Sequence, residues 1–233
     1  MIEFKQVTLH YHYDEFALLK GANFTLRNGL NTILCDTQSG KSSICKLLCK
    51  EVAATDGEII VDGLPISSIS SAGLGILYLP SQPAFFSNRT ARYNVEYPLK
   101  VRKVAKSERK QRVQEVAELL GVDCLDVKVS KLTDVQKKLV ALARGLTIPR
   151  KVVLFDDFFA VDESIESAES AHSRIESVTK LFPNAICVVL TSDKRLACGS
   201  CTVLDGGVTV YEGDADGAAC VIEQLEWISA RSK

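Results

Sequence analysis

The sequence predicts an α/β fold with a mostly parallel sheet, an N-terminal antiparallel β subdomain and an inserted α-helical subdomain. Two continuous apolar segments, 151–157 (KVVLFDD) and 185–193 (AICVVLTSD), are typical of strands that are buried on both faces. The first sixty residues instead contain short strand-like segments, and the middle of the chain becomes helical. We expect one domain over residues 1–233, composed of a core (1–86 and 150–233) and a helical subdomain (87–149).

The composition excludes two classes of protein. The 233 residues carry a formal net charge of −1, so no global field draws the chain to nucleic acid, and we expect no nucleic-acid partner. No run of 18 apolar residues is present to span a bilayer, and the first ten residues alternate like a strand rather than like a signal peptide. We therefore expect a cytoplasmic protein that is free to lie against a membrane.

The N-terminal elements are predicted from alternation and from turn residues. Strands are expected at 3–10, 22–26, 31–34 and 58–61, with turns at 27–29 and 56–58. A helix is expected at 41–52, with an apolar stripe of Ile44, Leu47, Leu48 and Val52. A strand, a loop and a helix therefore follow one another around residue 40.

The helical middle and the C-terminal part are predicted from caps and breakers. Ser107 is expected to cap a helix that ends at Gly121. Thr133 and Gln136 form a capping box that opens the next helix, whose inward residues are expected to be Val135, Leu139, Leu142 and Leu146. Two short strands are expected around 205–207, followed by a helix near 218–228.

The segment 35–43 (CDTQSGKSS) has the residue types that bind a phosphate group. It matches G-x-x-x-x-G-K-[ST], except that Cys35 replaces the first glycine, where a small residue is tolerated if φ stays negative. Gly40 lets the backbone approach the anion, Lys41 reaches the β and γ phosphates, and the Ser42 hydroxyl holds Mg²⁺. The remaining candidate phosphate-binding residues are Asp36, Thr37, Gln38, Ser39 and Ser43. The strand before the loop and the helix after it disfavour the alternative, a chance S-G-K-S on a surface loop.

Asp156 ends the apolar strand 151–157 and is the candidate metal ligand of this strand. A lone acidic residue at a strand end is usually only solvated. In the same sheet as Lys41 and Ser42, however, its carboxylate is placed to meet Mg²⁺ directly or through water.

Five motifs in chain order resemble the ATP-binding cassette (ABC) ATPases, a family with the P-loop NTPase type of α/β fold. They are 7–11 (VTLHY), 78–86 (YLPSQPAFF, like the glutamine loop), 131–146 (KLTDVQKKLVALARGL, like the signature helix), 152–162 (VVLFDDFFAVD, like the Mg²⁺ strand) and 188–214, like the switch strand and closing β-ribbon. The resemblance implies ATP and Mg²⁺ as cofactors, with Tyr11 stacked on adenine and Thr133 and Gln136 binding ATP. It also implies that Gln82 contacts the metal.

The same resemblance implies partners. Two cassettes form a head-to-tail dimer, in which each ATP lies between one phosphate loop and the other signature helix. The helical subdomain docks onto a membrane-spanning permease, so the chain is expected to be peripheral on the cytoplasmic face of a membrane. The second cassette completes either a homodimer or, as we favour, a heterodimer.

The catalytic positions depart from the family pattern. Asp157 stands where the family has the Glu that polarises water, so the carboxylate is withdrawn by about 1.5 Å. Ser192 replaces the switch histidine and cannot carry positive charge. The glutamine of the glutamine loop aligns with Ser81, although a slip of one residue restores Gln82, and a shortened segment leaves the role of Asp162 open.

The signature LSGGQ becomes LTDVQ, so Asp134 and Val135 replace two glycines. Asp134 suits the helix dipole, but at ~4 Å from a γ phosphate and an effective dielectric near 20 it costs at most about 4 kcal/mol. We therefore expect Mg-ATP binding with slow or absent hydrolysis. The alternatives are an active transporter ATPase that needs its partner, a non-catalytic regulatory or scaffold subunit with ATP as a structural ligand, and a soluble ABC protein acting on ribosomes or DNA.

Two further features have no place in this hypothesis. The basic run from Lys100 to Arg112 is expected to be a solvated helix face, and the alternative is contact with lipid headgroups or RNA, although no aromatic residues interleave with it. The eight cysteines, which include the C-x-x-C of Cys198 and Cys201, are expected to be reduced thiols.

Overall fold

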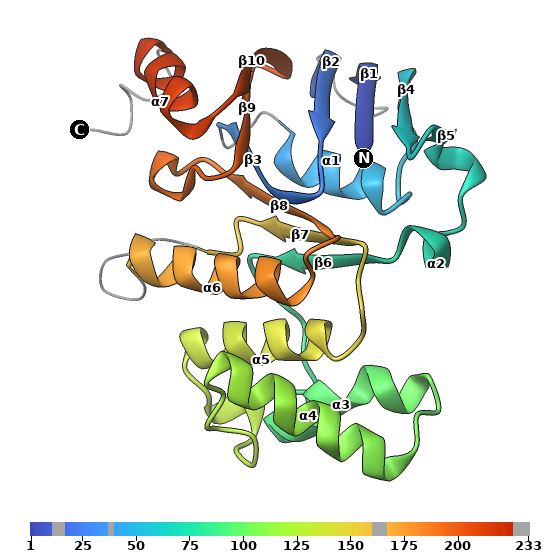
Figure 1. The fold of residues 1–233 in the computed structure, drawn as a ribbon, viewed down its shortest axis with the longest axis vertical. Coiled ribbons are helices and arrows are strands. Elements are labelled where there is room, and N and C mark those ends of the chain that lie inside the picture. The colour runs from blue at the N-terminus through green and yellow to red at the C-terminus, as the bar shows by residue number, and fades with distance from the viewer. Residues whose placement is uncertain (11–16, 37–39, 160–166, 226–233) are drawn as a thin grey trace.

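A computed structural model describes residues 1–10, 17–36, 40–159 and 167–225 of the chain (Figure 1). Its described part contains two sheets and a separate group of helices below them in the view of Figure 1. The expected α/β architecture, with an antiparallel N-terminal sheet and a mainly parallel second sheet, is confirmed.

The second sheet has six strands in the order β10-β9-β3-β8-β7-β6, and all neighbouring pairs except β10 and β9 are parallel. The strands are β3 (Gly29–Cys35), β6 (Ile76–Pro80), β7 (Val152–Asp156), β8 (Ile186–Thr191), β9 (Ser200–Asp205) and β10 (Val208–Gly213). Both apolar runs thus form central strands, and the two short strands around 205–207 pair as expected.

The first sheet is antiparallel throughout, in the order β2-β1-β4-β5. Its strands are β1 (Ile2–Leu9), β2 (Leu19–Leu26), β4 (Asp56–Val61) and β5 (Leu64–Pro65). Between the two sheets lies α1 (Lys41–Leu48), which ends four residues before the predicted end at Val52. Val52 nevertheless packs against the core from the loop that follows.

Alternation along the central strands explains why they are apolar throughout. Val152 and Leu154 face α1 and the N-terminal sheet, whereas Val153 and Phe155 face the core shared with the helical subdomain. Because successive side chains of a strand point to opposite faces, a sheet that is covered on both sides needs apolar residues at every position.

The helical subdomain consists of α3 (Ala91–Val101), α4 (Lys106–Leu120) and α5 (Asp134–Leu146). The predicted cap at Ser107 is wrong, because α4 begins at Lys106 and its N-cap residue, Ala105, makes no side-chain bond. Gly121 does end α4, in a left-handed conformation with a φ of 66°. The capping box of Thr133 and Gln136 is present at the start of α5.

Two elements of the core were not expected from the pattern, namely β6 and α6 (Ala168–Leu181), which covers one face of the second sheet (Figure 1). The last helix, α7 (Ala215–Gln224), begins three residues before its predicted start, and residues 226–228 of the prediction lie outside the described part. Short elements complete the chain: α2 (Ser71–Leu74) and three 3₁₀ turns at Ile66–Ser68, Val129–Lys131 and Lys194–Leu196. Within the described ranges no helix combines the length and the apolar character that crossing a bilayer requires.

Candidate functional site

Gly40, which follows the loop between β3 and α1, has the backbone conformation that the predicted phosphate loop requires. Gly40 precedes the first helical residue with a φ of 82°, and a Cβ atom there would lie 3.2 Å from the Leu18 carbonyl oxygen. Only glycine meets both conditions at low cost. Cys35 is fully buried in β3 and does not adopt a positive φ, so it is accommodated as predicted. Thr37, Gln38 and Ser39 lie outside the described residues.

Lys41 is a buried cation at the start of α1. Its side chain is 5% exposed, and its Nζ lies 3.1 Å from the Asp36 carbonyl oxygen and 3.4 Å from Asp157 Oδ2. Burial without counter-charge is costly for an ammonium group, and these two oxygens offset that cost. The ammonium group is therefore held beside the loop, where a phosphate would replace its present partners.

Asp156 is the centre of a hydrogen-bonded cluster that joins three elements. Its Oδ2 accepts hydrogen bonds of 2.8 Å from both the Ser42 hydroxyl and the Tyr78 phenol, and the residue is 5% exposed. Burial and the bond to Asp156 raise the pKa of Tyr78, which stays a neutral donor. This contact of Tyr78 was not expected from the sequence, in which the one signal is its position on a strand that leads into the glutamine-like loop.

The pair of Ser42 and Asp156 suits Mg²⁺. Both supply hard oxygen atoms that lie 2.8 Å apart, and Mg²⁺ usually takes one or two protein oxygens together with water and phosphate. Among the residues described, no group of three or more His, Cys, Asp or Glu side chains could hold a metal ion. A metal with few protein ligands, completed by a substrate's phosphates, therefore fits this donor set better than a metal held by protein alone.

Asp157 follows β7 in a strained conformation. Its φ is 44°, while its backbone N–H donates a 2.9 Å bond to the Leu190 carbonyl of β8. Non-glycine residues seldom adopt this conformation, although Asp tolerates it better than most. Ser192 comes directly after β8, whose Leu190 pairs with Asp156. The two parallel strands thus bring Asp156, Asp157 and Ser192 to one edge of the sheet.

Gln82 and Asp157 line a cavity of about 230 Å³ that also contacts the first turns of α5. The remaining lining residues are Ser81, Pro83, Phe85, Asp134, Lys137 and Lys138. Gln82 is exposed, and so is Ser81, its competitor for the glutamine position. This cavity therefore joins the glutamine-like loop, the end of β7 and the signature-like helix.

The negative charge at the start of α5 is better compensated than the sequence led us to expect. Asp134 Oδ1 lies 2.9 Å from Lys137 Nζ, so the acidic residue of LTDVQ has a counter-ion one turn along the same helix. The repulsion of at most about 4 kcal/mol between Asp134 and a γ phosphate holds for an uncompensated carboxylate, and the ion pair with Lys137 reduces it. Thr133 Oγ1 accepts a bond from the Gln136 N–H, and Gln136 Oε1 accepts one from the Thr133 N–H, so both predicted ligands serve the helix cap.

Other candidate residues stand as follows. Ser43 is buried in the first turn of α1, and Asp36 ends the described part of the loop. Tyr11, the predicted adenine platform, and Asp162 lie outside the described residues.

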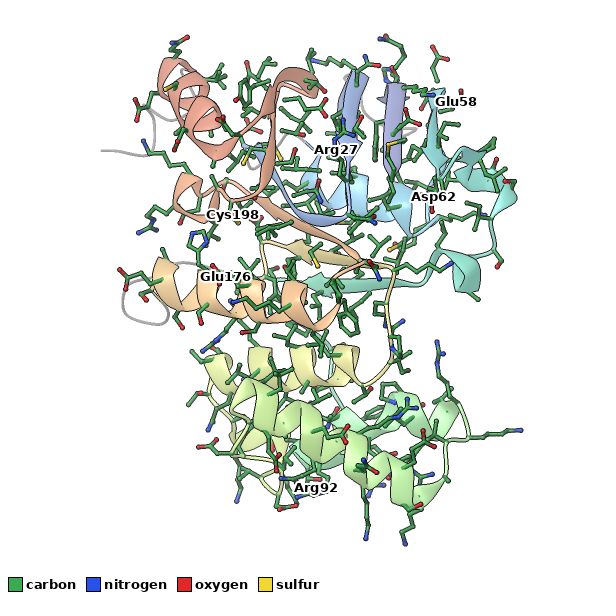
Figure 2. The ribbon with its side chains drawn as sticks, viewed as in Figure 1. Arg27, Glu58, Asp62, Arg92, Glu176 and Cys198 are labelled. Carbon is green, nitrogen blue, oxygen red and sulfur yellow. The ribbon has the colours of Figure 1, made fainter. Side chains whose placement is uncertain are left out.

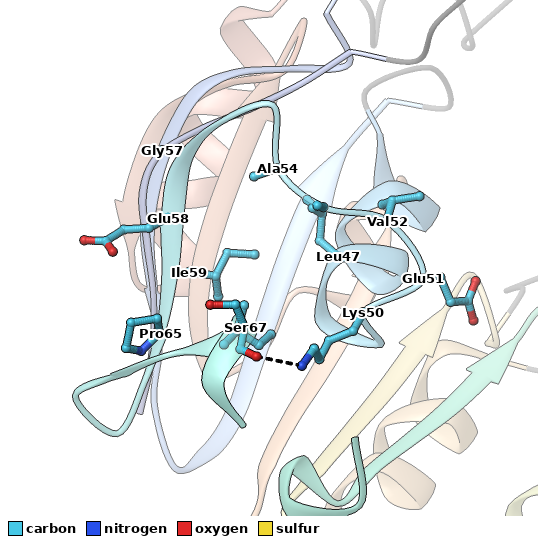
Figure 3. A pocket seen from close by; sticks show the side chains of 12 residues that line it. Leu47, Lys50, Glu51, Val52, Ala54, Gly57, Glu58, Ile59, Pro65 and Ser67 are labelled. Atoms are coloured by element: carbon cyan, nitrogen blue, oxygen red, sulfur yellow. Dashed lines mark hydrogen bonds between the residues drawn. The ribbon is translucent and has the colours of Figure 1, made fainter. Parts of the chain in front are cut away.

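A second cavity, of about 400 Å³, lies between the end of α1 and the ribbon of β4 and β5 (Figure 3). Leu47, Val52 and Ile59 supply part of its apolar wall. Lys50 spans one side, where its Nζ donates to the Ser67 and Ile69 carbonyl oxygens at 3.1 and 2.7 Å. None of the predicted phosphate, metal or catalytic residues lines it.

Comparison with known proteins places this site in context. The family model described as ABC transporter matches residues 19–160. Methionine import ATP-binding protein MetN 1 of Staphylococcus aureus strain N315 is 30% identical over 225 residues, which cover 91% of this chain and 65% of that protein. The protein of the same name from strain MRSA252 is also 30% identical, over 227 residues. The chain therefore spans about two thirds of the length of these curated relatives.

Two solved structures share the fold. A bacterial Atm1-family ABC exporter with ATP bound superposes with a TM-score of 0.78 at 19% identity, covering 98% of this chain and 41% of that one. The dimeric structure of a bacterial ABC transporter cassette gives a TM-score of 0.77 at 22% identity, covering 92% of this chain and 99% of that one.

Proposed function

Because the chain belongs to the ABC transporter family, we propose that it is an ATP-binding subunit that holds Mg-ATP at an interface with a second cassette and hydrolyses it slowly or not at all. The observation that carries the proposal is the cluster of Lys41, Ser42 and Asp156 around a glycine-terminated loop. Phosphate binding needs the cation and the loop, and Mg²⁺ binding needs the two oxygens.

Each residue of this cluster has a distinct part in nucleotide binding. The α1 N-terminus and Lys41 bind the β and γ phosphates, because the helix dipole and the ammonium both favour negative charge there. Ser42 and Asp156 would hold Mg²⁺, which neutralises charge between the phosphates when bound. Tyr78 keeps the Asp156 carboxylate oriented through its 2.8 Å hydrogen bond.

Slow hydrolysis is supported by the surroundings of Asp157, which stands where the family pattern has the Glu that polarises water. The Asp157 carboxylate lies 3.4 Å from Lys41 Nζ, so it is directed to the phosphate-binding lysine as well as toward the cavity that Gln82 lines. It is shorter than the Glu of the family pattern, and a misplacement of about 1 Å costs roughly a hundredfold in rate. Ser192 offers no cation for the γ phosphate.

The partners that we propose are a second cassette and a membrane-spanning permease. In Figure 1 the ends of β7 and β8 and the N-terminus of α5 lie on the same side of the molecule, so a second copy or a homologue can face both. A heterodimer is favoured, since in a homodimer every site would combine Asp157, Ser192 and LTDVQ. With a permease, the chain lies on the cytoplasmic face of a membrane.

Titration calorimetry with Mg-ATP, paired with a phosphate-release assay, tests both halves of the proposal. We expect binding by the purified chain that Lys41→Ala abolishes, with little phosphate released. Absence of binding at millimolar nucleotide would refute the ATP site. Rapid turnover that Asp157→Ala abolishes would refute slow hydrolysis and favour an active ATPase, and turnover that appears only with the partner cassette would do the same.

A further inference from the structure

The outer side of α3 and the α3–α4 loop form a surface that combines cations with aromatic rings. We call it the basic–aromatic corner and define it by Phe86, Tyr97, Lys100, Arg102, Lys103 and Lys106. We propose that this corner binds the anionic headgroups of a phospholipid membrane. Nucleotide takes no part in this contact, which is separate from the phosphate loop.

The aromatic half of the corner is exposed and fixed in place. Phe86 is 43% exposed and Tyr97 is 37% exposed, and their ring centroids lie 4.6 Å apart. The buried Asn94 side chain accepts a bond from the Phe86 N–H at 2.9 Å and donates one to the Phe86 carbonyl at 3.2 Å. The loop that carries Phe86 is thus tied to α3, and the rings stay at the surface instead of folding into the core.

The basic half of the corner carries more positive charge than the neighbouring acidic side chains neutralise. Residues 100–112 contain seven cationic side chains and one acidic one. Glu108 pairs with Arg112, and Glu96 pairs with both Lys100 and Arg109. The exposed side chains of Arg102, Lys103, Lys106 and Lys110 have no ion-pair partner within the ranges that the structure describes.

The shape of the corner places these cations outward. The α3–α4 loop lies at the lower right end of the molecule, and long side chains ending in nitrogen project from it (Figure 2). Lys103 has a φ of 57°, at a position just after a helix where glycine is usually preferred. The lysine at this position therefore carries a conformational cost.

These features favour lipid over two other anionic partners. RNA binding would need separate ring faces for stacking, but the Phe86 and Tyr97 rings lie against each other with their centroids 4.6 Å apart. The neighbouring Tyr93 ring is covered by Lys100 Nζ at 4.5 Å. An acidic protein segment would need a shaped groove, whereas a projecting corner of exposed cations suits a flat charged surface. Basic residues beside Tyr and Phe match the headgroup region, where amphipathic rings reside and each cation adds to binding.

Flotation of the purified chain with vesicles tests the proposal without nucleotide, so its outcome is independent of ATP binding. We expect the chain to float with phosphatidylcholine vesicles that contain phosphatidylserine, to remain behind with pure phosphatidylcholine, and to be released by high salt. The double variant Lys103→Glu/Lys106→Glu should weaken the partition at least about tenfold. Lys20→Glu/Lys180→Glu, at exposed lysines of β2 and α6, is the matched control and should float like the wild type.

Three results would overturn the proposal. The first is no flotation with phosphatidylserine vesicles, and the second is an equal partition of the two double variants. The third is capture by polyglutamate or RNA at the same salt concentration without flotation, which would identify an acidic polymer as the ligand. Circular dichroism of each variant shows whether it is still folded, so that weaker lipid binding is not confused with unfolding.

Discussion

Ser42 Oγ donates a 2.8 Å hydrogen bond to Asp156 Oδ2, and this bond connects the first turn of α1 to the end of β7. The strands that precede these residues are not neighbours, because β8 lies between β3 and β7. Parallel strands end at a common edge, which is why a residue of the loop after β3 meets a residue 114 positions later.

Substitution of Asp156 should separate metal binding from nucleotide binding. Asp156→Asn removes a charged oxygen ligand, so we expect Mg²⁺-dependent ATP affinity to fall at least about tenfold, while affinity without Mg²⁺ changes little. Calorimetry with and without EDTA measures both values. Tyr78→Phe is the control, since it removes one hydrogen bond to Asp156 but leaves both carboxylate oxygens, and it should cost less than Asp156→Asn.

Asp157→Asn should strengthen ATP binding rather than weaken it. The carboxylate competes with phosphate for Lys41, from which it is 3.4 Å distant, and its removal releases the ammonium group. The side chain is 42% exposed, so the gain is limited to about fivefold. Calorimetry measures the affinity, and a large loss of affinity would contradict the competition.

Asp157→Glu is the complementary variant for hydrolysis. It extends the carboxylate by about 1.5 Å and restores the residue type of the family pattern. We expect phosphate release above that of the wild type when the partner cassette is present. An unchanged rate would mean that Ser192 or LTDVQ, and not the length of this acid, limits the reaction.

The ion pair of Asp134 and Lys137 should control association through α5. Lys137→Met leaves Asp134 uncompensated at the helix end that we propose faces a second phosphate loop, so Mg-ATP-dependent association should weaken. Asp134→Asn should strengthen this association. In the Asp134→Asn background, Lys137→Met should reduce the free energy of association by about 0.2–1 kcal/mol less than it does in the wild type. Sedimentation of the chain, alone and with its partner cassette, measures these changes. Independent effects of the two substitutions would exclude the coupling.

Thr133→Ala should destabilise the protein by about 1 kcal/mol, because it removes the side-chain acceptor of the α5 capping box. Thr133→Ser keeps the hydroxyl and should retain most of the stability. Urea unfolding compares the two variants. If they are equally stable, the capping bond that is 3.3 Å long contributes little.

Cys35 should make stability fall at alkaline pH. Burial raises the pKa of this thiol from 9.0 to about 12, so the folded state holds the proton more tightly than the unfolded state does. The contribution is complete below pH 9 and is lost as pH rises from 9 to 12. At pH 10 the loss is about 1.4 kcal/mol. Cys35→Ala should lose less stability than the wild type between pH 8 and pH 10, as urea unfolding at each pH can measure.

Cys35 also shows how far a local pattern can be trusted. The strand that contains it and the helix that follows were predicted from the order of residue types, because apolar periodicity acts locally. The capping box of α5 was predicted for the same reason, since its two partners are three residues apart. Ser107 failed as a cap because Ala105 and Lys106 already begin α4 in the tertiary setting of the subdomain.

The sequence by itself predicted the α/β architecture and a candidate phosphate loop with Lys41 and Ser42, since these depend on residue types at short spacing. Only the tertiary structure decided that Tyr78 supports Asp156, that Asp157 reaches Lys41, and that aromatic rings adjoin the basic run of α3 and α4. These contacts join strands, loops and helices whose separation is set by strand order and helix packing. No local pattern of residues encodes that separation.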